Sequence, residues 1–313
     1  MEHVSVISAF KFAFRTFFKN ILFFIGASVI TVLAWMAGFI ASLLAAVPFM
    51  IPLWRAFGKI KSALSGLFAE LSATKAAVVQ AGTPAAVINV QTLEKFKGVL
   101  SKIWASVSNL ISQFPHVLFF IVLGVLVFLF VILLVQMMLS LGWCRISLNF
   151  KDKGSSEIST LFVRLGLAFK GMVVVALSIF ILMMPWFVTY IFFKIHVILG
   201  ILSVAISIFL TIYFGLKLAY SFYFLADKEV GAFSAIKGSF SLIGGPSRMF
   251  FFILLMIPVG IAGGLIVGLI MSVLRLALLG QLFQIFIQFA LSTISILGVG
   301  YIYRELEKGR QQV

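Results

Sequence analysis

The chain has 313 residues, of which 63% are hydrophobic and only 11% are charged, and its formal net charge is +15. Soluble domains carry about 25% charged residues, so this composition excludes a soluble fold and requires lipid as the solvent for most side chains. The basic residues stand in short segments between apolar runs, which favours contact with anionic lipid head groups over contact with nucleic acid. Cys144 is the only cysteine, which excludes an intrachain disulfide.

Residues 4–19 interleave phenylalanine with basic side chains. Lys11, Arg15 and Lys19 are four residues apart and therefore share one face of a helix. Aromatic side chains fill much of the remaining circumference, as in helices that lie in the head-group plane of a bilayer. The pattern predicts an amphipathic interfacial helix. The alternative is that these residues form the first turns of the helix that follows.

Six uncharged apolar runs predict six transmembrane helices, because roughly 20 apolar residues span a bilayer as a helix. The runs are residues 21–50, 117–141, 171–193, 197–216, 249–274 and 276–302. Pro48 and Pro52 mark a kink or an end of the first span. The polar tail that follows the last span is expected to fray. The predicted fold class is an all-α integral membrane protein.

Residues 55–116 lack a run of spanning length and instead carry two rows of apolar positions. The steps alternate between three and four residues, which is the spacing of a coiled-coil seam. The rows are Phe57, Ile60, Leu64, Leu67, Leu71, Thr74 and Val78, and then Leu93, Phe96, Leu100, Ile103, Val107, Leu110 and Phe114. With the turn signal at residues 81–84, they predict an extramembrane helical hairpin that could bind a protein partner or a second copy. The alternative is two amphipathic helices lying flat on the membrane.

The distribution of Lys and Arg predicts the orientation, because short connections rich in these residues stay in the cytoplasm. With the N-terminus inside, the cytoplasmic segments hold 15 Lys and Arg residues, whereas the two short outer turns hold only Lys194 and Arg275. We expect a cytoplasmic-membrane protein with both termini inside and the hairpin outside. Its parts would be residues 1–54 with the interfacial helix and first span, 55–116 with the hairpin, and 117–313 with five further spans.

Three segments share one layout, in which a short amphipathic stretch with basic residues runs directly into a span. They are residues 7–25, 156–175 and 231–253. The chain can therefore be interpreted as three copies of an interfacial helix followed by two spans, with the hairpin inserted into the first copy. Such repeats are common in membrane folds and do not by themselves imply transport.

The third copy carries the motif Phe224-x-x-Asp227, followed by Ala235-x-x-x-Ser239-x-x-x-x-Gly244. On these residues the sequence resembles a group of poorly characterised prokaryotic multi-pass membrane proteins. The group includes the membrane domain attached to some glycerophosphodiester phosphodiesterases. The resemblance covers roughly residues 142–304 and implies a multi-pass architecture without established catalysis. The hairpin departs from the usual pattern of the group, and the soluble phosphodiesterase barrel is absent from this sequence.

The fifth predicted span contains Gly260, Gly264 and Gly268 at steps of four residues. Small residues at this spacing let helix backbones approach closely, so the three glycines predict a packing seam. The sequence favours a partner helix in the same chain, and the alternative is a helix of another molecule.

The sixth predicted span carries five polar side chains on one helical face: Gln281, Gln284, Gln288, Ser292 and Ser295. Buried amides are costly in lipid unless they are hydrogen-bonded, so we expect this polar stripe to point into the helix bundle. There it would either join helices to each other or line a polar path.

Acidic and basic residues gather in the predicted cytoplasmic turns, where Asp152 stands between two lysines and Asp227 precedes Lys228, with Lys237 further along. Asp152 and Asp227 are expected to start interfacial helices and to pair with local cations. The alternatives are a proton relay or a cation site. The predicted spans contain no acidic residue, which disfavours an ion-coupled transporter or a proton pump.

The sequence contains no motif of paired catalytic carboxylates, no metal-ligand spacing among its His and Cys residues, and no phosphate-binding glycine loop. We therefore expect no enzyme activity, metal or cofactor. The expected function is that of a structural, assembly or lipid-handling component in contact with anionic inner-leaflet lipids. The alternative is a transporter or channel for a small or amphiphilic solute that uses the polar stripe.

Overall fold

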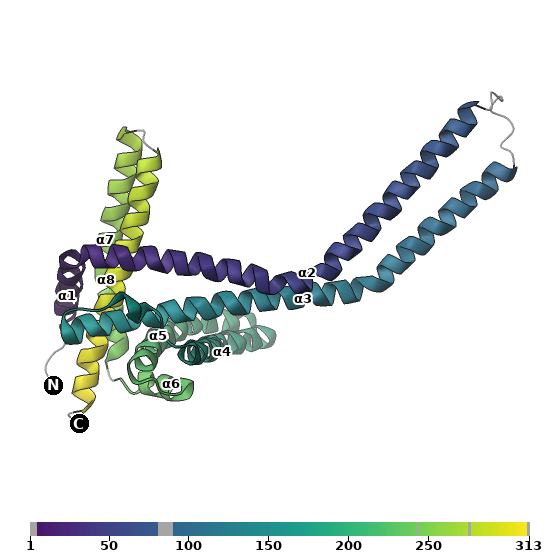
Figure 1. Cartoon of the computed structure of the whole chain (residues 1–313). Coiled ribbons are helices and arrows are strands. Elements are labelled where there is room, and N and C mark those ends of the chain that lie inside the picture. The colour runs from purple at the N-terminus through teal and green to yellow at the C-terminus, as the bar shows by residue number, and fades with distance from the viewer. Residues whose placement is uncertain (1–4, 81–89, 243, 275–276, 312–313) are drawn as a thin grey trace. The chain divides into compact units, whose positions relative to one another are not determined.

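The computed structural model describes residues 5–80, 90–242, 244–274 and 277–311, and within them all regular secondary structure is helical (Figure 1). The elements are α1 (Val6–Lys19), α2 (Ile21–Gln80), α3 (Val90–Lys153), the 3-10 turn η1 (Ile158–Leu161), α4 (Leu165–Ile195), α5 (Val197–Lys228), α6 (Ala232–Phe240), α7 (Gly245–Leu274) and α8 (Ala277–Gln311). Six of these helices are long and apolar enough to cross a membrane. The chain is therefore an all-α integral membrane protein, as its composition predicted.

The chain forms two compact units, which are described separately. The first unit comprises Met1–Met36 and Leu133–Val313, and the second comprises Ala37–Ile132. The first unit holds α1 and α4 to α8 together with the start of α2 and the end of α3. The second unit holds the remainder of α2 and α3, including the predicted hairpin.

In the second unit α2 and α3 run antiparallel as two unbroken helices (Figure 1). The rings of Phe39 and Phe128 meet edge to face with centroids 5.6 Å apart, so the two helices touch directly. The helix itself continues through Pro48 and Pro52, whereas its stretch long and apolar enough to cross a membrane ends at Ile51. A proline removes one backbone hydrogen bond, and a helix can bend around it without stopping. The two apolar rows of the hairpin lie outside the side chains that the structure describes.

In the first unit α1 packs against the middle of α8, between Phe289 and Tyr301. Ala9, Ala13 and Phe17 are fully buried on one face of α1, while the three basic side chains of that helix are exposed. The ring of Phe17 lies 6.0 Å from that of Phe289 in α8, centroid to centroid. The backbone turns at Asn20, where the helical φ and ψ values are lost. Because of this turn α1 is a separate helix and not the first turns of α2.

The layout of a short helix followed by two long ones recurs, but its second copy differs from the prediction. Only the four residues of η1 precede α4, in place of an amphipathic α-helix. The backbone of Leu161 lies directly against Gly142 of α3, where a Cβ atom would overlap the Leu161 carbonyl group. The Leu161 side chain is itself fully buried. This close approach holds the segment as a packed turn, because a longer helix could not follow the same path.

The connection from α5 through α6 to α7 depends on a buried lysine. The Nζ atom of Lys217 donates hydrogen bonds to the carbonyl oxygens of Phe240 at 2.9 Å and Leu242 at 2.8 Å. Carbonyl groups at a helix C-terminus have no partner within the helix, so Lys217 caps α6. The Tyr220 hydroxyl donates to the carbonyl oxygen of Gly245 at 3.0 Å. This hydrogen bond joins α5 to the first residue of α7.

Candidate functional site

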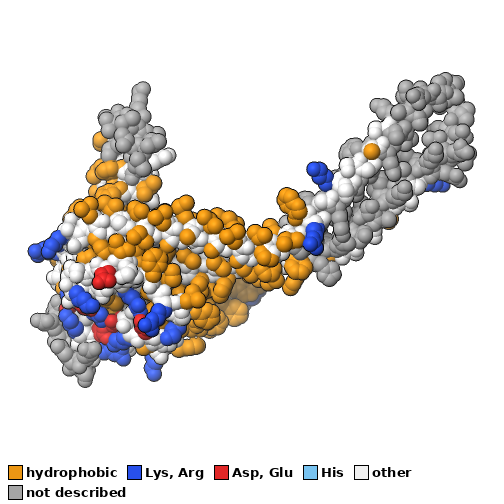
Figure 2. All heavy atoms as spheres, in the orientation of Figure 1, with side chains coloured by type: hydrophobic (Ala, Val, Ile, Leu, Met, Phe, Trp, Pro, Cys, Tyr) orange, Lys and Arg blue, Asp and Glu red, His pale blue; other side chains and the backbone are white. Residues whose placement is uncertain are grey.

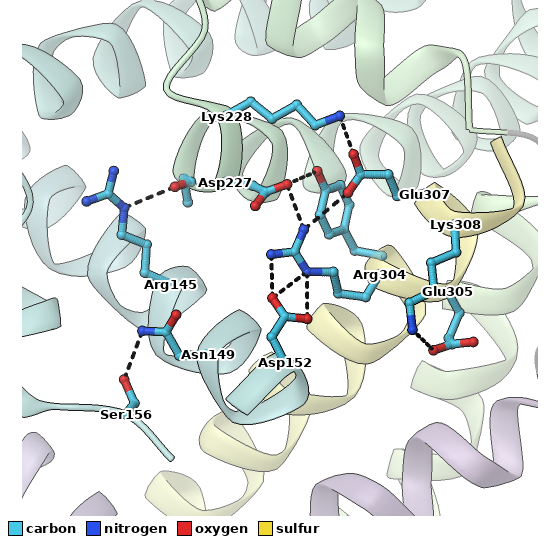
Figure 3. Close-up of polar contacts among 12 residues, drawn as sticks. Arg145, Asn149, Asp152, Ser156, Asp227, Lys228, Arg304, Glu305, Glu307 and Lys308 are labelled. Atoms are coloured by element: carbon cyan, nitrogen blue, oxygen red, sulfur yellow. Dashed lines mark hydrogen bonds and ion pairs between the residues drawn. The ribbon is translucent and has the colours of Figure 1, made fainter. Parts of the chain in front are cut away.

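Charged side chains from the C-terminal ends of α3, α5 and α8 converge in the first unit (Figure 3). Five carboxylates and five cations form ion pairs there. We call this set the charged network: Arg145, Lys151, Asp152, Asp227, Lys228, Glu229, Arg304, Glu305, Glu307 and Lys308. The formal charges of its members cancel, so the network is neutral as a whole.

Arg304 of α8 is the centre of the charged network. Its Nε atom donates to both carboxylate oxygens of Asp152 at 3.1 and 3.0 Å, and its Nη2 atom donates to Oδ2 of the same residue at 2.6 Å. Its Nη1 atom donates to Asp227 at 2.8 Å and to Glu307 at 3.2 Å. The planar guanidinium group can satisfy several carboxylates at once because its five N–H donors have fixed directions. Arg304 therefore joins α3, α5 and α8.

The predicted roles of Asp152 and Asp227 are wrong. Both lie at the C-terminal ends of helices, and both pair with Arg304, which is 152 and 77 residues away in the sequence. The neighbouring cations Lys151 and Lys228 pair instead with Glu305 and Glu307 of α8. A carboxylate is unfavourable at the negative end of a helix dipole, so each aspartate needs a strong cation from another element. The Arg304 guanidinium is that cation.

The polar tail was expected to fray, but it forms the last turns of α8 and carries four of the ten members of the charged network. Tyr303 is fully buried and Leu306 is nearly so, which anchors these turns in the core. The Tyr303 hydroxyl donates to Asp227 at 3.1 Å. The sequence did contain a signal, because Ile302 and Leu306 are four residues apart and continue the apolar face of the span. The high charge of the tail obscured it.

Two further cations satisfy the C-terminus of α5, where Glu229 adopts the left-handed conformation with φ of 50°. Arg145 donates from Nε to the carbonyl oxygen of Ala226 at 3.0 Å and also pairs with the Glu229 carboxylate. Lys170 donates from Nζ to the carbonyl oxygen of Glu229 at 2.9 Å. The turn that the sequence predicted at residues 227–229 is therefore held by side chains of α3 and α4.

Other basic side chains of the first unit are exposed and lie outside the charged network. Figure 2 shows Lys and Arg side chains gathered at one end of this unit, while hydrophobic side chains cover much of the rest. Several basic side chains are exposed, and within the described part of the chain no ion pair links them to a carboxylate. We call this set the exposed cations: Lys11, Arg15, Lys19, Lys153, Arg164, Lys237 and Arg310. Because the network is neutral, these seven residues contribute to the excess positive charge of the described part of the first unit. Lys170, Lys194, Lys217 and Arg248 add to this excess, and the carboxylate of Glu157 reduces it.

The predicted glycine seam is displaced. A Cβ atom at Gly263 would lie 2.9 Å from Cγ2 of Ile287 in α8, so α7 packs closely against α8 at Gly263. A Cβ atom at Gly260 would still be 3.8 Å from Leu291, but at Gly264 and Gly268 it would meet nothing within 4 Å. The assignment of Gly264 and Gly268 to a seam within the chain is therefore wrong. The face of α7 that meets α8 contains Gly260 and Gly263, and Gly264 lies on a different side of the helix.

The polar stripe also differs from its prediction. Within this chain the side chains of Gln281, Gln284, Gln288 and Ser292 are exposed, and Ser295 is half-buried. The expectation that the stripe points into the bundle is therefore wrong. The contacts between α7 and α8 use apolar side chains such as Ile287 and Leu291, which occupy a neighbouring face of α8.

No family model matches the chain, and no curated protein or solved structure matches it. The motif residues behind the resemblance have packing roles in this structure. The ring of Phe224 lies beneath Gly238, where a Cβ atom would be 3.0 Å from the ring. The Ser239 hydroxyl donates to the carbonyl oxygen of Lys217. Gly244 has φ of 72°, a conformation that favours glycine at the turn into α7.

Proposed function

We propose that the protein is a non-catalytic, lipid-handling component of the cytoplasmic membrane that binds anionic inner-leaflet lipid at its charged end. One observation carries this proposal. Five acidic side chains at that end are paired within the neutral charged network and only Glu157 of the described first unit lies outside it, whereas the exposed cations have no carboxylate partner among the described residues. Basic residues near an anionic leaflet contribute about 1 kcal/mol each to membrane attraction.

The charged network supports this function in two ways. It neutralises carboxylates that would otherwise repel lipid phosphates at short range. It also ties the ends of α3, α5 and α8 together through Arg304, so that Lys153 of α3 and Arg310 of α8 are carried on a fixed framework. Preorganised groups bind more tightly because less conformational entropy is lost on binding.

The proposed orientation follows from the Lys and Arg bias and places the charged end and both termini in the cytoplasm. Single cysteines at Gly82 and Gly309, introduced on a Cys144→Ser background, would test it. Gly82 lies outside the described residues, and a side chain at Gly309 would meet nothing within 4 Å. In intact cells an impermeant thiol reagent should label only the cysteine at position 82. Labelling of both from outside would contradict the orientation.

The transporter alternative depended on a polar path lined by the stripe of α8. Because Gln281, Gln284 and Gln288 are exposed in the chain, they line no path between its own helices. We therefore favour the lipid-handling function. Solute flux through liposomes that contain the purified protein, well above that of empty liposomes, would overturn this choice.

The experiment that tests the function compares nanodiscs of phosphatidylcholine with nanodiscs that also contain phosphatidylglycerol. Anionic lipid should raise the Tm by roughly 2–4 °C for each kcal/mol of added stabilisation. The rise should shrink at high salt, because exposed charges are screened beyond a Debye length of about 3 Å at 1 M. An equal Tm in both lipids at low salt would refute the proposal.

The hairpin of residues 55–116 is proposed to face the outside and to bind a protein partner or a second copy of the chain. A photo-crosslinker at Ser65, an exposed residue in the arm of α2, would capture such a contact. A discrete adduct that includes a second protein chain supports this role. Adducts with lipid alone would support the alternative in which the two arms lie flat on the membrane.

A further inference from the structure

A hollow lies beside the charged network, between the end of α5, the length of α6 and the end of α8. Its volume is about 320 Å³. It is lined by Phe224, Lys228, Val230, Ser234, Lys237, Gly238, Ser241 and Arg310. Ser234 belongs to the first turn of α6 and Ser241 to its C-cap, so the hollow follows the whole helix and is not a feature of one helix terminus.

Three cations from three different elements line this hollow. Lys228 comes from α5, Lys237 from α6 and Arg310 from α8. Lys228 forms an ion pair with Glu307. Within the described part of the chain neither Lys237 nor Arg310 forms an ion pair. The hollow has no acidic lining residue, and its wall therefore carries a net positive charge.

The apolar floor of the hollow positions two of these cations. The Lys228 Nζ atom lies 5.5 Å from the centroid of the Phe224 ring, and the Arg310 guanidinium carbon lies 6.0 Å from it. A cation within about 6 Å of an aromatic centroid is attracted to the face of the ring. Gly238 leaves room for that ring, because a Cβ atom there would be 3.0 Å from it. The two cations are thus held at the wall of a site with an apolar base.

We propose that this hollow binds a phosphate-bearing group. Lys237 and Arg310 supply the opposing charge, and the Ser234 hydroxyl on the same lining can donate a hydrogen bond. The Ser241 hydroxyl already donates to the carbonyl oxygen of Gly238. Arginine binds phosphate oxygens with two parallel N–H donors, and lysine binds them as a point charge. The inference rests on the proposed function in one respect: it takes an anionic lipid head group as the source of the phosphate. A free phosphate ion would present the same chemistry.

A polar wall over an apolar floor matches the end of a phospholipid, in which an anionic phosphate is joined through the glycerol esters to apolar acyl chains. Small-molecule sites have volumes of about 300–1,000 Å³, and the hollow of about 320 Å³ is at the lower end of that range. It therefore has room for a head group while the acyl chains remain outside. Basic pockets at the cytoplasmic side of membrane helices are a recognised setting for anionic head groups.

The test measures binding of three probes to the whole protein in an uncharged detergent at low salt. The probes are dihexanoyl phosphatidylglycerol, dihexanoyl phosphatidylcholine and inorganic phosphate. The test variant is the double substitution Lys237→Gln and Arg310→Gln. The matched control is Arg55→Gln with Lys61→Gln, which removes the same charge from exposed residues of α2 that belong neither to the exposed cations nor to the lining of the hollow. A third variant, Ser234→Phe, fills the hollow without changing any charge.

Wild-type protein should bind phosphatidylglycerol saturably and more tightly than phosphatidylcholine. The double variant should bind it roughly tenfold more weakly or worse, since charge-assisted hydrogen bonds to the phosphate are lost. Ser234→Phe should also weaken binding, and the control should retain it. Inorganic phosphate that competes at equal concentration would support the site and identify free phosphate as the source. Competition only by the lipid would identify the head group.

Two results would overturn the site. Equal loss in the double variant and the control would show that only the general surface charge matters, and the proposed contact with anionic lipid would stand without the hollow. Full retention in both the double variant and Ser234→Phe would place binding elsewhere. If wild-type protein failed to distinguish phosphatidylglycerol from phosphatidylcholine, the proposed function would fail together with the site.

Discussion

Helix α8 carries the polar stripe near one end and part of the charged network at the other. The polar side chains of these two regions differ in whether they have partners within the chain. At the C-terminal end of the helix, Arg304 and Glu307 have partners within the chain. At the other end, Gln281 and Gln284 are exposed. The fold of a single chain thus satisfies the charges at one end and leaves the amides of the other end to their surroundings. Polar residues at helical spacing do not by themselves predict burial.

The space around the glycines of α7 and α8 differs in the same way between the two ends. A Cβ atom at Gly298 would overlap the Phe252 ring, and one at Gly300 would overlap the Ser147 hydroxyl. At Gly264, by comparison, there is open space within 4 Å. Close packing is concentrated near the charged network, although Gly264 belongs to the more conspicuous sequence motif. Three substitutions can test this comparison, in order of decreasing expected effect.

Arg304→Met should cause the largest loss of stability. It leaves Asp152, Asp227 and Glu307 without the guanidinium that joins them. Breaking a buried ion pair typically costs 3–5 kcal/mol. We expect about 3 kcal/mol, toward the lower end, because the Asp152 side chain is 37% exposed and solvent screens it. Titration with a denaturing detergent would measure the free energy of unfolding.

Two controls accompany that measurement. Arg164→Met removes an exposed cation without an ion pair and should change stability by less than about 0.5 kcal/mol. Arg304→Lys keeps the charge but loses the planar fork, so its stability should lie between wild type and Arg304→Met. If Arg304→Met proved as stable as Arg164→Met, the network would not hold the helix ends together.

Gly298→Ala should have the next largest effect. The added methyl group would overlap the Phe252 ring, and overpacking of a dense core usually costs about 1–3 kcal/mol. Gly264→Ala is the matched control on the open face, where alanine should be neutral or stabilise the helix by up to about 1 kcal/mol. Equal unfolding free energies for the two variants would show that the close packing around Gly298 is absent.

Gln284→Leu should have the smallest effect on the isolated chain. Its side chain is exposed, and even a lost interhelical hydrogen bond averages only about 0.6 kcal/mol in a membrane. Unfolding of dilute protein in mild detergent should therefore be unchanged within that value. A larger destabilisation under these conditions would mean that the stripe has a partner inside the chain after all.

Composition and run length were sufficient to predict the fold class. Six uncharged apolar runs correspond to six helices because each must satisfy its backbone internally in lipid. The rotation of each helix was not predictable, since it depends on contacts with neighbours. Gly263 rather than Gly264 faces α8, although the two differ by one position. A shift of one residue turns a helical side chain by about 100°, which exceeds what a spacing pattern can resolve.

The charged network was the least predictable feature. Asp152, Asp227 and Arg304 were all visible in the sequence, but nothing in their local spacing links residues 152 and 77 positions apart. Local neighbours such as Lys228 were the natural candidates for pairing. Long-range pairing is decided by where helix ends meet, so it emerges only once the packing of α3, α5 and α8 is known. The signal that could have helped was the apolar face that continues through Leu306.

The continuity of α2 and α3 restricts how the hairpin can change in length. Both helices run without a break from the span into the arm. Inserting one residue into such a helix turns every later residue by about 100° about the axis and advances it by about 1.5 Å. An addition of about seven residues, close to two full turns, is the shortest that returns each side chain to within about 20° of the same face. Related chains with longer or shorter arms should therefore differ by matched steps of seven residues in both helices, and deletions of a single residue should be rare there.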